Sequence, residues 1–118
     1  YSHCIAHGYD MALGGEQQKL AVDSGYWPLF RFDPRRIAAG ELPMVLDSGA
    51  PKSALAAFMR NETRFRMVEQ QDPARFKELL ASAEYHLKER YAAYEQTAKM
   101  TLPAPPPPEP AAAPADGK

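Results

Sequence analysis

The segment of this 118-residue chain with the most reactive side chains is its first eight residues, YSHCIAHG, which hold the only cysteine. From the residues alone, Cys4 has three interpretations. A free cysteine most commonly behaves as a small buried hydrophobe. Cys4 could instead be a nucleophile activated by His3 or His7, because a thiolate forms near neutral pH only beside a base or a positive charge. The third interpretation is a metal ligand alongside both histidines, although structural zinc requires four ligands and these are at most three.

This motif stands at the very first residues, with no initiator methionine before it. The chemistry that such a motif serves would need partners that the segment itself lacks. We therefore expect those groups to lie upstream, and we expect the chain to be one piece of a larger enzyme.

The elements that must position this motif are short in the first half of the sequence. The residue pattern predicts, in order, a loop at 1–9, a short helix within 15–24, extended segments at 26–34 and 43–47, and a loop at 35–42. Gly25 stands where a helix often ends in the left-handed conformation. Pro28 favours the edge or the start of a strand, so no long regular sheet is expected.

The second half of the sequence is expected to be helical. Apolar residues at helical spacing predict one amphipathic helix over about 53–70 and another over 73–100. Asp72 followed by Pro73 is a strong start signal for the second helix. Such a helix would be on the order of 40 Å long, which exceeds what a compact domain of about 100 residues needs. We expect it to pack on something else. His86, which lies among charged residues of this helix, is expected to be solvated.

Composition excludes several classes of partner. Fourteen Lys and Arg residues against fifteen Asp and Glu give a net charge of -1, so no basic field exists to attract nucleic acid or anionic lipid. The apolar runs are shorter than the roughly 20 residues that cross a bilayer, so no membrane partner is expected. The single cysteine agrees with a reducing compartment, and the expected location is the cytoplasm. The Pro- and Ala-rich residues 101–118 predict a disordered tail.

Four stretches of this sequence resemble the C-terminal region of the pyruvate:ferredoxin (flavodoxin) oxidoreductase family. They are YSHCIAHG at 1–8, which includes CIAHG at 4–8, EQQKLAVDSGYWPLFRF at 16–32, LDS at 46–48 and NETRF at 61–65. They follow one another in order, and the resemblance extends over roughly residues 1–100.

This resemblance implies an α/β fold class in which residues 1–100, mostly helical here, are the C-terminal end of a thiamine diphosphate-binding fold with a long C-terminal helix. It implies a parent enzyme that oxidatively decarboxylates pyruvate to acetyl-CoA and passes single electrons through iron-sulfur clusters to ferredoxin or flavodoxin. Pyruvate, coenzyme A, the rest of the enzyme and the electron acceptor would be the partners. The parent is expected to be a homodimer, and this piece alone is expected to be inactive.

The resemblance also assigns Cys4 as a metal ligand. In the family, the cysteine at this position is the last of four that hold a four-iron four-sulfur cluster, and the other three lie far upstream. Thiamine diphosphate and magnesium would be bound mainly by the missing upstream part. His3 and His7 would be groups that surround the cluster or ordinary hydrogen-bonded loop histidines, and both interpretations stay open. Two alternatives for the whole chain are a stand-alone docking subunit that donates Cys4 across an interface, and an inactive remnant.

Overall fold

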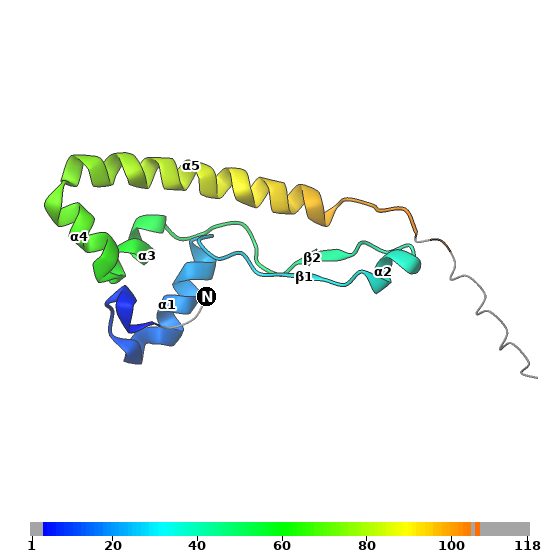
Figure 1. The fold of residues 1–118 in the computed structure, drawn as a ribbon, viewed down its shortest axis with the longest axis horizontal. Coiled ribbons are helices and arrows are strands. Elements are labelled where there is room, and N and C mark those ends of the chain that lie inside the picture. Colours follow the sequence, from blue (N-terminus) through cyan, green and yellow to red (C-terminus); the bar gives the residue numbers. More distant parts are fainter. Residues whose placement is uncertain (1–3, 105, 107–118) are drawn as a thin grey trace, which may run out of the picture.

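The structure, a computed structural model, describes residues 4–104 and 106, which are mostly helical (Figure 1). In chain order the elements are η1 (Ile5–His7), η2 (Met11–Leu13), α1 (Gly14–Asp23), β1 (Phe30–Phe32), α2 (Arg35–Ala38), β2 (Met44–Leu46), α3 (Leu55–Asn61), α4 (Thr63–Gln71) and α5 (Pro73–Ala98). The mostly helical architecture with a long C-terminal helix is confirmed. His3 and most of the predicted tail lie outside the described residues. Residues 101–104 form neither helix nor strand.

The long helix α5 begins where the sequence predicts. The Asp72 carboxylate accepts a hydrogen bond from the backbone N–H of Arg75 at 2.9 Å, and Pro73 occupies the first turn. This cap satisfies one of the N–H groups that a helix start leaves unpaired. The helix has 26 residues and is therefore about 39 Å long. It runs past α4 and α3 and then alongside the strand pair (Figure 1).

The single helix predicted over 53–70 is wrong, because the structure divides it into α3 and α4 at Glu62. The backbone there is extended, with φ -103° and ψ 127°. The physical cause is tertiary: the Glu62 side chain is fully buried, and the backbone N–H of Thr63 donates to the Gly8 carbonyl at 3.1 Å. These distant partners compensate for the interruption of the helix.

The two predicted extended segments pair with each other as an antiparallel two-stranded sheet, with Phe30 opposite Leu46 and Phe32 opposite Met44. The loop expected over 35–42 is wrong in part, since it contains the single helical turn α2. The Asp33 carboxylate nucleates this turn by accepting the backbone N–H of Arg35 at 3.0 Å.

The core is small and lies where α1, α3 and α5 meet. Its buried apolar side chains are Ala21, Leu55, Phe58, Met59, Phe76 and Leu87. Tyr26 packs on Phe58 with ring centroids 4.4 Å apart, and Phe30 of β1 stacks on Tyr94 of α5 at 5.3 Å. Large apolar side chains remain exposed elsewhere, and Phe32 is 53% exposed. Within the described residues, no helix has the length and apolar character of a membrane span.

Candidate functional site

Cys4 lies at the start of the short turn η1, and its side chain is exposed. Its carbonyl accepts the backbone N–H of His7 at 3.0 Å, and the Ile5 carbonyl accepts that of Gly8 at 3.0 Å. Gly8 ends the turn with a φ of 68°, a conformation that favours glycine. The predicted loop at 1–9 thus contains one 3-10 turn. The interpretation of Cys4 as a small buried hydrophobe is wrong for this structure.

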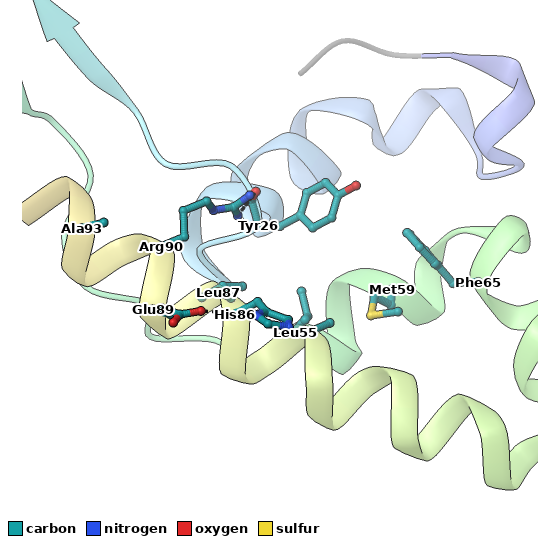
Figure 2. A pocket seen from close by; sticks show the side chains of 10 residues that line it. Tyr26, Leu55, Met59, Phe65, His86, Leu87, Glu89, Arg90 and Ala93 are labelled. Carbon is teal, nitrogen blue, oxygen red and sulfur yellow. Dashed lines mark hydrogen bonds and ion pairs between the residues drawn. The ribbon is translucent and has the colours of Figure 1, made fainter.

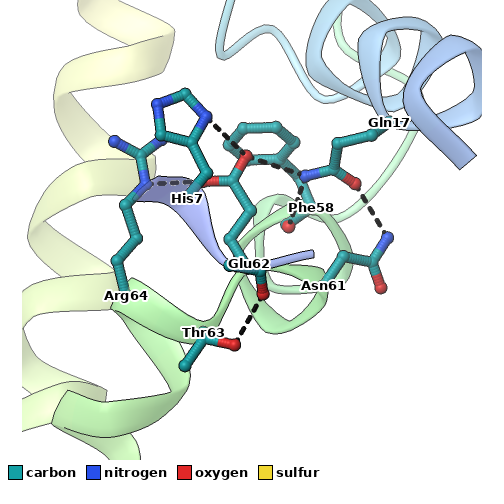
Figure 3. Close-up of polar contacts among 8 residues, drawn as sticks. His7, Gln17, Phe58, Asn61, Glu62, Thr63 and Arg64 are labelled. Carbon is teal, nitrogen blue, oxygen red and sulfur yellow. Dashed lines mark hydrogen bonds and ion pairs between the residues drawn. The ribbon is translucent and has the colours of Figure 1, made fainter. Parts of the chain in front are cut away.

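The imidazole of His7 lies beside Glu62, with its Nδ1 4.0 Å from Glu62 Oε1 (Figure 3). Among residues 4–104 and 106, no group of three or more His, Cys, Asp and Glu side chains gathers to hold a metal ion. His3, the other histidine of the hypothesis, lies outside these residues. Cys4 is the only thiol of the chain.

Glu62 is a carboxylate with no exposed surface. Its Oε1 accepts a hydrogen bond from Gln17 Nε2 at 3.0 Å, and its Oε2 accepts one from Arg64 Nε at 2.5 Å. Figure 3 shows the carboxylate between these groups and His7. Burial by itself would lower the pKa of the Arg64 guanidinium, but its hydrogen bond to Glu62 and the negative charge there raise it. A buried carboxylate is tolerated when it is paired and hydrogen-bonded in this way.

The amide of Gln17 ties α1 to the junction between α3 and α4. Its Nε2 also donates to the Phe58 carbonyl at 3.2 Å, and its Oε1 accepts a hydrogen bond from Asn61 Nδ2 at 2.9 Å. Gln17 is itself buried. Its amide group thus serves as donor and acceptor at once, which fixes its orientation.

Thr63 contacts the Cys4 turn directly. Its Oγ1 donates to the Gly8 carbonyl at 2.6 Å, and its backbone N–H donates to the same oxygen at 3.1 Å. The approach is so close that a Cβ placed on Gly8 would lie 2.6 Å from Thr63 Cβ. The CIAHG and NETRF stretches, far apart in the sequence, therefore meet in space.

Sequence reasoning missed Gln17, Glu62 and Thr63 as parts of this site. In the sequence, Glu62 falls at the same helical spacing as the apolar residues that predict the helix over 53–70. A carboxylate in an apolar stripe was the available signal, because a charged residue that must be buried needs a partner. The identity of that partner, 45 residues away in α1, was not encoded locally.

A separate pocket of about 520 Å³ lies between α5 and the α3 and α4 pair (Figure 2). Its walls are mainly apolar, with Met59 and Phe65 opposite α5. The polar groups at its rim contact one another. His86, exposed as predicted, has its Nδ1 3.2 Å from Glu89 Oε2, and Arg90 Nη2 donates to the Tyr26 carbonyl at 2.8 Å. Cys4 is not among the residues that line it.

No family model matches the chain. It is 48% identical over 98 residues to a pyruvate-flavodoxin oxidoreductase of Rhodospirillum rubrum, and 42% identical over 98 residues to one of Trichormus variabilis. It is 34% identical over 99 residues to a pyruvate:ferredoxin oxidoreductase of Moorella thermoacetica. These matches cover 83%, 83% and 84% of the chain, which spans 8% of the length of each relative. By this similarity the chain belongs to the pyruvate:ferredoxin (flavodoxin) oxidoreductase family.

Proposed function

We propose that this chain is the C-terminal segment of a pyruvate:ferredoxin or flavodoxin oxidoreductase, which we call the parent enzyme. The parent oxidatively decarboxylates pyruvate to acetyl-CoA and passes electrons singly to ferredoxin or flavodoxin. The observation that supports this is the 48% identity, over 83% of the chain, to a relative named pyruvate-flavodoxin oxidoreductase. Because the chain spans 8% of that relative's length, thiamine diphosphate, magnesium and the substrates would be bound mainly by the remainder. The segment alone would be inactive.

Within this proposal, Cys4 is one ligand of a four-iron four-sulfur cluster. Such clusters are usually held by four cysteine thiolates. Cys4 fits one of these positions, because its thiol is exposed at the head of a hydrogen-bonded turn. It is the only cysteine of the chain, so the other three thiolates would come from elsewhere in the parent. When bound, the cluster would supply one-electron redox chemistry.

The other residues of the turn define the local conformation of the main chain after Cys4. The backbone N–H groups of His7 and Gly8 are engaged inside the turn. They therefore restrain the main chain on the C-terminal side of Cys4. The parent is expected to be a homodimer, and its cytoplasmic location stays a prediction from the sequence.

The ligand role is tested by Cys4→Ala in the parent enzyme. We expect loss of the iron and the electron paramagnetic resonance signal of one cluster, together with loss of one-electron reduction of ferredoxin or flavodoxin. Pyruvate binding should be retained, because the pyruvate site would lie outside this segment. The matched control is Ile5→Ala, which removes a side chain that is 85% exposed from the same turn without removing sulfur.

Wild-type iron content and wild-type ferredoxin reduction in Cys4→Ala would overturn the ligand assignment and favour the inactive remnant. The segment assignment is tested separately by sequencing the DNA upstream of the Tyr1 codon. A reading frame that continues into a diphosphate-binding region with three further cysteines supports it. A start codon directly before Tyr1 would contradict it and favour the stand-alone docking subunit.

A further inference from the structure

We propose that Gln17, Glu62 and Thr63 form a latch that positions the Cys4 turn for cluster binding. The latch lies at the junction of α3 and α4, with Gln17 reaching it from α1. This inference rests on the proposed role of Cys4 as a cluster ligand, and it assigns a positioning role to three residues that the ligand role alone does not involve.

The turn that carries Cys4 has little to hold it in place by itself. The element η1 is three residues long, and none of them is buried. The hydrogen-bond geometry of such 3-10 turns is poorer than that of an α-helix. A ligand to a metal site, however, must be held to within about 0.5 Å of its productive position. The restraint therefore has to come from outside the turn.

The contact that supplies this restraint is made by Thr63 on the carbonyl of Gly8. One oxygen accepts both the Thr63 hydroxyl at 2.6 Å and the Thr63 N–H at 3.1 Å. Gly8 also has the left-handed φ and the close approach that exclude a side chain there. The end of the turn is thus fixed in position and in conformation.

The buried carboxylate of Glu62 fixes the part of the main chain from which Thr63 acts. Its extended backbone separates α3 from α4 and directs the first N–H of α4 toward Gly8. Gln17 and Arg64 hold its two oxygens. The same carboxylate faces His7, the last residue of the turn, across 4.0 Å. Burying a charge is a weak route to stability but a recognised route to one defined geometry.

The test replaces the Thr63 hydroxyl in the parent enzyme and measures the turn directly. Thr63→Val removes the donor but keeps the shape and the backbone N–H, whereas Thr63→Ser keeps the hydroxyl. The Thr63 hydroxyl also accepts a hydrogen bond from Arg66 Nη2 at 2.8 Å. Loss of the hydroxyl and of its hydrogen bond to Gly8 should increase hydrogen exchange at the His7 and Gly8 amides about 2- to 10-fold in Thr63→Val. Thr63→Ser should restore the wild-type rate. The control is Thr97→Val, whose hydroxyl donates to the Ala93 carbonyl at 2.8 Å inside α5.

A second measurement asks whether the turn positions a cluster. The cluster of interest is the one whose resonance signal is lost in Cys4→Ala. Its midpoint potential and its resonance spectrum should shift in Thr63→Val and return to the wild-type values in Thr63→Ser. Glu62→Gln should shift the potential and the spectrum too. Gln17 and Arg64 each donate a hydrogen bond to the Glu62 carboxylate, and in the variant one of these donors would face an amide nitrogen, which cannot accept it. Its matched control, Glu69→Gln, disturbs a more exposed carboxylate paired with Arg60 and should leave the signal unchanged.

The possible outcomes separate the two proposals. Wild-type exchange at His7 and Gly8 in Thr63→Val, with an unchanged cluster signal, overturns the latch and leaves the ligand role standing. A cluster that persists unchanged in Cys4→Ala overturns the ligand role, and with it the purpose assigned to the latch. Faster exchange with a shifted signal that Thr63→Ser rescues supports the latch.

Discussion

Gly25 closes α1 in the left-handed conformation, with a φ of 74°. A Cβ placed there would lie 2.6 Å from Pro51 Cγ and 2.8 Å from Leu87 Cδ2. Arg90 Nη2 adds a hydrogen bond to the Gly25 carbonyl at 3.1 Å. The left-handed end of this helix was predicted from the sequence and is confirmed. The close approach of Pro51 and Leu87 is a tertiary fact that no local pattern contained.

Gly25→Ala should therefore destabilise the folded structure more than Gly40→Ala does. Gly40 has a φ of 73° but nothing within 4 Å of an added Cβ. Both substitutions should lower the folding stability by about 1–2 kcal/mol, because alanine is strained in the left-handed conformation. Only Gly25→Ala should lower it by about 1–3 kcal/mol more, because the added methyl group overlaps with packed neighbours. The measurement is hydrogen exchange of the amides next to each glycine in the parent enzyme. Equal increases at the two sites would refute the packing argument.

Among the elements, α5 was predicted well and the helix over 53–70 was not. The start of α5 depends on Asp72 and Pro73, which are adjacent in the sequence and act on the first turn. The division at Glu62 depends on Gln17 and Gly8, which lie 45 residues before Glu62 and 55 residues before Thr63, respectively. Amphipathic spacing cannot report such partners, because it records only which face is apolar.

The turn α2 should depend on pH through Asp33. The hydrogen bonds from the Arg35 side chain and then from its backbone N–H lower the pKa of this carboxyl to about 2. The ordinary value is about 3.9. The pKa of Asp33 is therefore lower in the folded chain than in the unfolded chain. As a result, the carboxylate stabilises α2 above about pH 4, and this contribution is lost as the pH falls toward 2.

This dependence can be measured by nuclear magnetic resonance titration of Asp33 and of the Arg35 amide in the parent enzyme. Both should report a midpoint near the lowered pKa. In the control Arg35→Gln, the Asp33 midpoint should move back toward the ordinary value. An unchanged midpoint in this variant would show that Arg35 is not the cause.

At the scale of the whole molecule, the apolar surface is larger than the core can cover. Seven apolar residues among those described are buried, and six of them form the core cluster. Side chains of the strand pair and of α5 remain exposed, including Phe32 at 53% and Tyr85 at 63%. The expectation that the long helix packs on something else agrees with this exposure. We propose that the remainder of the parent covers these faces.

The isolated 118 residues should consequently be partly molten. We expect helical far-ultraviolet circular dichroism, weak near-ultraviolet signals and a broad thermal transition. A chain that ends after residue 104 should behave in the same way, because the remaining residues are predicted to be a disordered tail. A sharp cooperative transition with strong near-ultraviolet signals would count against this prediction.

The sequence by itself determined the features that neighbouring residues or direct similarity encode. These are the family, the start of α5, the left-handed end of α1 and the presence of two short extended segments. Capping, periodicity and glycine conformation act over a few residues, so a linear pattern contains them.

Only the tertiary structure decided how the Cys4 turn is held. The division at Glu62, the burial of its carboxylate and the contact of Thr63 with Gly8 all join segments that are far apart in the chain. Each depends on donors and acceptors that become partners only after the core brings α1, α3 and α4 together. A hydrogen bond is satisfied by position in space, and sequence spacing does not specify that position.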